Sequence, residues 1–76
     1  MTGTEKISNR LRSAVAFYRT GGGNLEVALY DLGISNANWI RYTQDIEIPP
    51  AKVVSLLANE FGVSGEWLAT GKGSML

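Results

Sequence analysis

The sequence predicts an all-α fold in which five short helices form one domain, residues 1–76. Over most of the chain, apolar residues recur at intervals of three and four, which is the period of a helix with one buried face. Glycine, serine, asparagine and proline stand between these stretches, where helices end and begin. The alternating segment Ile46-Glu47-Ile48 is too short for a strand and runs into two prolines, so we expect no sheet.

The first helix is expected over residues 4–20, with Thr4 as its N-cap. Its apolar residues fall on one stripe of the helix surface: Ile7, Leu11, Ala14, Val15 and Tyr18. Three consecutive glycines, residues 21–23, then end the helix. A phosphate cradle is an alternative role for them. However, no strand precedes them and no Gly-Lys-Ser follows, so we expect a flexible loop.

A second helix is expected over residues 25–32, with Asn24 as its N-cap. Gly33 follows its last apolar residue, and a glycine at this position readily takes the left-handed conformation that ends a helix. One face of this helix is apolar and is expected to be buried: Leu25, Ala28, Leu29 and Leu32.

A third helix is expected over residues 36–44, with Ser35 as its N-cap. Ile34, before the cap, can pack on Trp39 as a hydrophobic staple. Two helices joined by so short a turn must cross steeply. The second and third helices therefore predict a helix-turn-helix.

A fourth helix is expected over residues 50–61, with Pro50 in its first turn. A fifth helix, over residues 64–70, repeats the earlier signature, with Ser64 as N-cap and Val63 as the staple residue before it. The fourth helix has an apolar face that we expect in the core: Val54, Leu57, Ala58 and Phe61.

The composition excludes several kinds of site. The chain has no cysteine and no histidine, so a disulfide framework is impossible and the usual nitrogen and sulfur ligands of zinc are missing. Histidine is also the most frequent general base. We therefore expect no enzymatic activity, no metal and no cofactor. No apolar run approaches the ~20 residues of a membrane-spanning helix, and no signal-peptide pattern is present. We expect a cytoplasmic protein.

The net charge is zero, with seven basic and seven acidic residues. Nucleic-acid-binding domains are usually basic, so the total charge counts against that function. The distribution is uneven, however, because five of the seven cations lie in the first 41 residues: Lys6, Arg10, Arg12, Arg19 and Arg41. The N-terminal half can therefore present a positive face.

Two segments carry a family resemblance. Residues 57–71 contain a Leu-Ala pair, a Phe-Gly-Val-Ser turn, a Trp-Leu pair and a Thr-Gly pair, and Leu32-Gly33-Ile34-Ser35 is followed by Tyr42 and Pro49. These motifs are similar to those of the lambda-repressor-like family, which includes the phage CI and Cro repressors. The resemblance covers roughly residues 7–73. It implies a helix-turn-helix protein that binds double-stranded DNA sequence-specifically and regulates transcription.

The resemblance also implies which residues meet DNA. The third helix would enter the major groove, and its candidate base-reading residues are Ser35, Asn36, Ala37, Asn38 and Arg41. Their chemistry agrees, because asparagine can pair with adenine, arginine with guanine, and the alanine methyl can touch thymine. Contacts to the DNA backbone are expected from Asn24, Arg10, Arg12 and Lys52. The arginines of the first helix could equally form a solvated face.

A module of this size reads only a few base pairs, so a homodimer on a palindromic operator is expected. The half-sites would lie about one helical turn, ~34 Å, apart. Such a dimer would act as a repressor of the phage lysogeny type by occluding a promoter. The expected dimer surface is the fifth helix and the tail, with Gly65, Trp67, Leu68, Met75 and Leu76.

Some positions depart from the family. Leu25 stands where a glutamine is usual, and Leu29 stands where a small alanine usually lets the two helices touch. Either the second helix packs differently, or one extra residue precedes the turn. Asp45 and Glu47 lie where basic residues often meet phosphate. The zero net charge and the apolar Leu25 and Val27 leave a second function open: a protein-binding module, such as an antirepressor, without a DNA target.

Overall fold

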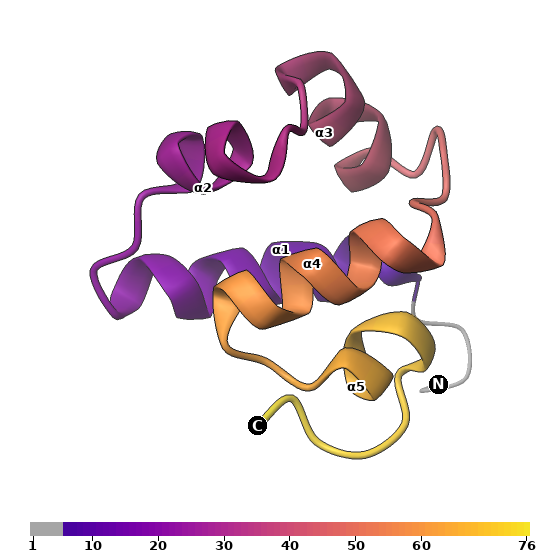
Figure 1. Ribbon diagram of the computed structural model, residues 1–76. Coiled ribbons are helices and arrows are strands. Elements are labelled where there is room, and N and C mark those ends of the chain that lie inside the picture. Colours follow the sequence, from indigo (N-terminus) through magenta and orange to yellow (C-terminus); the bar gives the residue numbers. More distant parts are fainter. Residues whose placement is uncertain (1–5) are drawn as a thin grey trace.

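Five helices and no strand make up residues 6–76, which are the part of the chain that the computed structural model describes (Figure 1). The radius of gyration is 11.4 Å, close to the ~11 Å expected of a compact domain of this length. The all-helical fold is therefore confirmed. The helices are α1 (Ile7–Thr20), α2 (Leu25–Leu32), α3 (Asn36–Thr43), α4 (Ala51–Phe61) and α5 (Gly65–Thr70).

Helix α1 is the scaffold of the domain, because it packs against each of the other four helices. α4 runs beside α1, with α2 and α3 on one side of this pair and α5 on the other (Figure 1). α3 packs mainly on α1, and α2 packs on α1 and α4, whereas α2 and α3 touch one another little. Leu29 is buried in the core.

The core takes residues from all five helices. Trp39 packs its ring edge-on to Phe61 at a centroid distance of 6.2 Å, and Tyr18 lies 5.0 Å from the same ring. The expected faces of α1 and α4 are confirmed, although Ile7 and Tyr18 are only partly buried. Phe17 and Tyr30 lie outside the core. Its buried apolar residues are Leu11, Ala14, Val15, Ala28, Leu29, Tyr42, Val54, Leu57, Ala58, Phe61, Val63 and Leu68.

The expected N-caps of three helices are confirmed. The side chains of Asn24, Ser35 and Ser64 each accept a hydrogen bond from the backbone N–H three residues later, at 3.1, 3.1 and 3.2 Å. Each bond satisfies a donor that the first turn of a helix leaves unpaired. Gly33 ends α2 in the left-handed conformation, with φ of 74°. Local sequence therefore sets these boundaries.

Two helix starts differ from the expectation. Thr4 lies outside the described residues, and α1 begins at Ile7 with Lys6 in the cap position, where its side chain makes no capping bond. Pro50 precedes α4 and does not open its first turn, because its ψ of 156° is extended. Its carbonyl still accepts the first helical bond, from the N–H of Val54 at 3.0 Å. Pro50 is therefore the N-cap.

The three glycines form an ordered tight turn between α1 and α2. The N–H of Gly23 donates to the carbonyl of Tyr18 at 2.9 Å. A Cβ on Gly23 would lie 2.5 Å from the Tyr18 ring, so only glycine fits beneath that ring. The hydroxyl of Tyr18 in turn donates to Glu60 on α4 at 3.2 Å. Tyr18 thus ties the start of α2 to both long helices.

Arg10 is buried, with 5% of its surface exposed, and it joins α1 to α5. Its Nε donates to the carbonyl of Leu68 at 2.9 Å and its Nη2 to that of Ala69 at 3.1 Å. These bonds satisfy carbonyls that the end of a helix leaves unpaired. They also place a positive charge at the negative end of α5. The expectation that Arg10 contacts a DNA phosphate is therefore wrong, because the side chain faces inward.

Replacing Gly23 by alanine is expected to lower the free energy of unfolding by about 1–3 kcal/mol, because the Tyr18 ring must move. Gly21→Ala is the matched control, since a Cβ there meets only ordinary contacts of 3.6 and 3.8 Å. It should be neutral or stabilising by up to ~1 kcal/mol. Urea unfolding of both variants tests this, and equal effects would contradict the role of the Tyr18 ring.

Replacing Arg10 by methionine is expected to lower the free energy of unfolding by about 2–3 kcal/mol, because buried charge-assisted bonds to α5 are lost. Lys72→Met removes an equal charge from the exposed tail and should change stability by less than ~0.5 kcal/mol. Thermal or urea unfolding measures both. If Arg10→Met unfolds like the control, the α1–α5 clamp does not stabilise the domain.

Candidate nucleic-acid interface

The two faces of α3 differ in their exposure to solvent. Its inward face carries Trp39 and Tyr42, which pack on the core. The outward face is a row of exposed residues spaced one helical turn apart, which comprises Asn36, Ala37, Ile40, Arg41 and Gln44. Because successive turns stack every three or four residues, these side chains share one surface. This row is called the outer face of α3.

The structure separates the predicted base-reading residues. Asn36, Ala37 and Arg41 lie on the outer face of α3, and Ser35 is exposed at its start. Asn38 is half-buried, and its Oδ1 accepts a hydrogen bond from Nη1 of Arg41 at 3.4 Å. Asn38 therefore points toward Arg41 and can hold the guanidinium in place.

Two residues of the outer face were not singled out from the sequence. Ile40 keeps 48% of its surface exposed although it is apolar, and Gln44 follows the last residue of α3 as its C-cap. The spacing in the sequence places both residues on this face, because Ile40 lies four residues after Asn36 and Gln44 four residues after Ile40.

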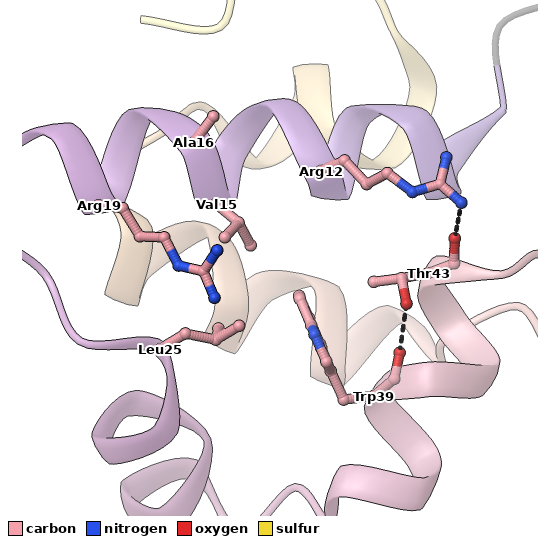
Figure 2. A pocket seen from close by; sticks show the side chains of 7 residues that line it. All are labelled: Arg12, Val15, Ala16, Arg19, Leu25, Trp39 and Thr43. Atoms are coloured by element: carbon pink, nitrogen blue, oxygen red, sulfur yellow. Dashed lines mark hydrogen bonds between the residues drawn. The ribbon is translucent and has the colours of Figure 1, made fainter.

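Arg12 binds across two helices. It donates to Asn9 Oδ1 at 3.0 Å and to the backbone carbonyl of Thr43, the last residue of α3 (Figure 2). The bond from Arg12 fastens the end of α3 to α1, and Thr43 Oγ1 donates within α3 to the Trp39 carbonyl at 3.0 Å. Arg12 is still exposed. It is a positioning residue for α3 as well as a candidate phosphate contact.

Asn24 and Lys52 lie at the starts of two other helices. Asn24 is exposed and caps α2, which leaves its side-chain NH2 without a hydrogen bond in the described part of the chain. Lys52 is exposed in the first turn of α4. Within residues 6–76 the Lys52 ammonium has no acidic partner. Both groups are free to donate to an anion.

An ion pair joins the loop between α3 and α4 to the residue that precedes α1. Lys6 Nζ donates to Asp45 Oδ2 at 2.7 Å. The hydrogen bond to Asp45 and the charge of its carboxylate raise the pKa of Lys6 above the ordinary 10.5. The negative charge of Asp45, which would repel a phosphate, is therefore compensated, whereas Glu47 has no such partner in the described residues.

The predicted dimer surface is largely inside the domain. Leu68 is fully buried, so its expected role at a dimer surface is wrong. Trp67 and Met75 pack against the core, and the Met75 carbonyl accepts a bond from the N–H of Ser64 at 2.7 Å, which folds the tail onto α5. Only Gly65 and Leu76 of the predicted set are exposed.

Comparison of the chain with models of protein families, with curated proteins and with solved structures finds no match. Among residues 6–76, no three acidic side chains gather as a metal site would require. No helix in this part of the chain has the length and apolarity needed to cross a membrane.

Replacing Asp45 by asparagine should bring the pKa of Lys6 back toward 10.5, because the carboxylate that raises it is gone. Asparagine tolerates the positive φ of 62° at this position. The stability that the raised pKa contributes is present below pH 10.5 and is lost as pH rises through the folded-state value. An NMR titration of the lysine Cε signals reads this pKa. Glu47→Gln is the control, and an equal shift in both variants would contradict the pairing.

Proposed function

We propose that the chain is a sequence-specific DNA-binding regulator of transcription of the lambda-repressor type, in which α2 and α3 form a helix-turn-helix. The observation that carries this proposal is the outer face of α3, which is exposed while the opposite face of the same helix is held in the core. Helix α3 has eight residues, and an α-helix with its side chains is about 10–12 Å across. A helix of this diameter can enter the major groove, which is about 12 Å wide.

Each residue of the outer face has a role that base chemistry supports. Asn36 and Gln44 can each pair bidentately with adenine, and Arg41 can pair with guanine. Ala37 and Ile40 offer methyl groups to thymine. Asn38 supports Arg41 through its hydrogen bond of 3.4 Å, because a guanidinium held in one orientation loses less entropy on binding.

Contacts to the DNA backbone fall to a small set of groups. Arg12, Lys52 and the Asn24 amide remain exposed. Arg10 instead hydrogen-bonds to carbonyls of α5, and Lys6 forms an ion pair with Asp45. Arg12 and Lys52 give four cations in a dimer. At −0.9 per phosphate, log affinity should then fall against log salt with a slope of about −3.6. This modest slope fits a chain of zero net charge.

The proposed repressor acts as a homodimer on a palindromic operator, with half-sites ~34 Å apart. Of the dimer residues expected on α5 and the tail, only Gly65 and Leu76 are exposed, and two residues offer far less area than the ~1,200 Å² or more that stable interfaces bury. The proposed dimer therefore assembles cooperatively on the operator, and the free protein is expected to be mainly monomeric at micromolar concentration.

A protein-binding module is the second candidate function. The observation in its favour is the exposed side of α2, where Val27 is 54% and Tyr30 86% exposed. Exposed aromatic residues frequently anchor protein interfaces. Leu25 does not belong to this surface, because it packs against the core. An apolar interface of this kind would respond little to salt.

Selection of genomic fragments by the purified protein at moderate salt tests the two functions. An enriched inverted repeat with a salt slope near −3.6 is the result expected of the repressor. If the folded protein enriches no sequence, the DNA-binding proposal fails. Binding of a host protein through Val27 and Tyr30 then becomes the function to test by substitution.

Two substitutions separate base reading from backbone contact. Arg41→Ala is expected to cost about 1–3 kcal/mol on the enriched repeat and to relax preference at one base pair. Lys52→Ala should weaken binding to all sequences alike and make the salt slope shallower by about one per protomer. Competition assays with cognate and random duplexes measure both effects. If both variants lose the same affinity on both duplexes, α3 does not read the bases.

A further inference from the structure

A groove runs along α1 where α2 and α3 face it, and Figure 2 shows the side chains around it. Its volume is about 280 Å³. Arg12 and Arg19 are seven residues apart on α1, so they lie two turns apart on one side of that helix. Trp39 enters the space between them from α3. Of the residues that line this groove, the base and backbone contacts proposed above use only Arg12, as a phosphate contact.

The floor of the groove is apolar. Val15 points into it from α1 (Figure 2) and is 7% exposed. Leu25 reaches it from the first turn of α2, and both Leu25 and Trp39 are partly buried. The Trp39 ring is held from behind by Phe61, at an interplanar angle of 77°. The floor is therefore a fixed aromatic and aliphatic surface.

The two arginines of the rim are not equivalent. The Arg12 guanidinium is engaged by Asn9 and by the Thr43 carbonyl. The Arg19 guanidinium turns toward the groove above Leu25 (Figure 2). No side chain in the described part of the chain hydrogen-bonds to Arg19 or forms an ion pair with it. One end of the groove thus offers a cation with its planar fork of donors uncommitted.

We propose that this groove binds a small aromatic carboxylate, with its ring against Val15 and Trp39 and its carboxylate on Arg19. A guanidinium can hold a carboxylate through two parallel hydrogen bonds. The volume of about 280 Å³ lies just below the range for small-molecule sites, ~300–1,000 Å³, so the ligand has one or two rings. The proposal concerns a small-molecule site and does not depend on DNA binding.

The charge pattern selects this chemical class. The Arg19 guanidinium, which has no partner in the described residues, is complementary to one negative charge. The apolar floor beside it is complementary to a ring and not to a second anion. Inorganic phosphate could contact Arg19 but would leave the floor open to water. A neutral aromatic compound would cover the floor but would leave Arg19 without a partner. Only a molecule with both parts is complementary to the whole groove.

NMR titration of the full ¹⁵N-labelled chain with sodium 2-naphthoate tests the proposal. The chain has two tryptophans, so two indole N–H signals report separately, and Trp67→Phe assigns them. Trp67 lies on α5, on the other side of α1 from the groove (Figure 1). The Trp39 signal should shift saturably while the Trp67 signal stays in place. Equal shifts of both signals, or none, would overturn the proposal.

Two control compounds separate the parts of the ligand. The neutral alcohol 2-naphthalenemethanol keeps the rings without the charge, and inorganic phosphate keeps a charge without rings. Each should bind at least about tenfold more weakly than 2-naphthoate at the Trp39 signal, because each loses one of the two contacts. If either matches 2-naphthoate, the groove is not a site for aromatic carboxylates.

A pair of variants tests the residue that carries the charge. Arg19→Gln should weaken 2-naphthoate binding about tenfold, whereas Lys72→Gln removes an equal charge from the exposed tail and should leave it unchanged. Both side chains are exposed, so both variants are expected to fold, as circular dichroism can verify. Equal affinities in the two variants would overturn the assignment of Arg19.

Discussion

Burial of the apolar stripe of α1 is the constraint on which the rest of the structure depends. A chain of 76 residues without cysteine has no covalent staple, so its stability must come from apolar packing. Every other helix packs on α1, whereas α2 and α3 touch one another little. The position of α3 is consequently set by its packing on α1 and by the bond from Arg12 to Thr43, and Trp39 on its inward face packs on Phe61 of α4. The outer face of α3 is held in position because the opposite face packs on the core.

The small size of the domain also explains how its cations are used. Arg10 binds the carbonyls at the end of α5, Lys6 pairs with Asp45, and Arg12 binds the end of α3. A small domain has few residues with which to terminate and position five helices, so long cationic side chains do this work. Net charge is then a poor guide to the surface. The cations that remain exposed without such partners, such as Lys52 and Arg19, decide what the surface can bind.

Helix α3 connects the two proposed sites. Its outer face would meet DNA bases, and its inward Trp39 forms one wall of the groove on α1. The two surfaces therefore lie on opposite sides of one helix of eight residues. The exposed Val27 and Tyr30 form a third surface on α2. A small domain needs its apolar side chains for the core, so it is unusual that these two are exposed. Their exposure is the strongest physical reason to retain a protein partner as the second candidate.

The sequence by itself determined the helices and most of their ends, because these depend on neighbours in the chain. Apolar spacing predicted the buried faces of α1 and α4, and Asn24, Ser35 and Ser64 cap as expected because a cap needs only a backbone N–H three residues away. Tertiary structure decided which polar and apolar side chains remain exposed. Residues distant in sequence decide that Arg10 faces the end of α5 and that Leu68 lies in the core. The rotation of α3 about its axis decides that Asn38 points to Arg41. The groove beside Arg19 exists only because three helices meet there, and no local sequence pattern predicts how helices pack against one another.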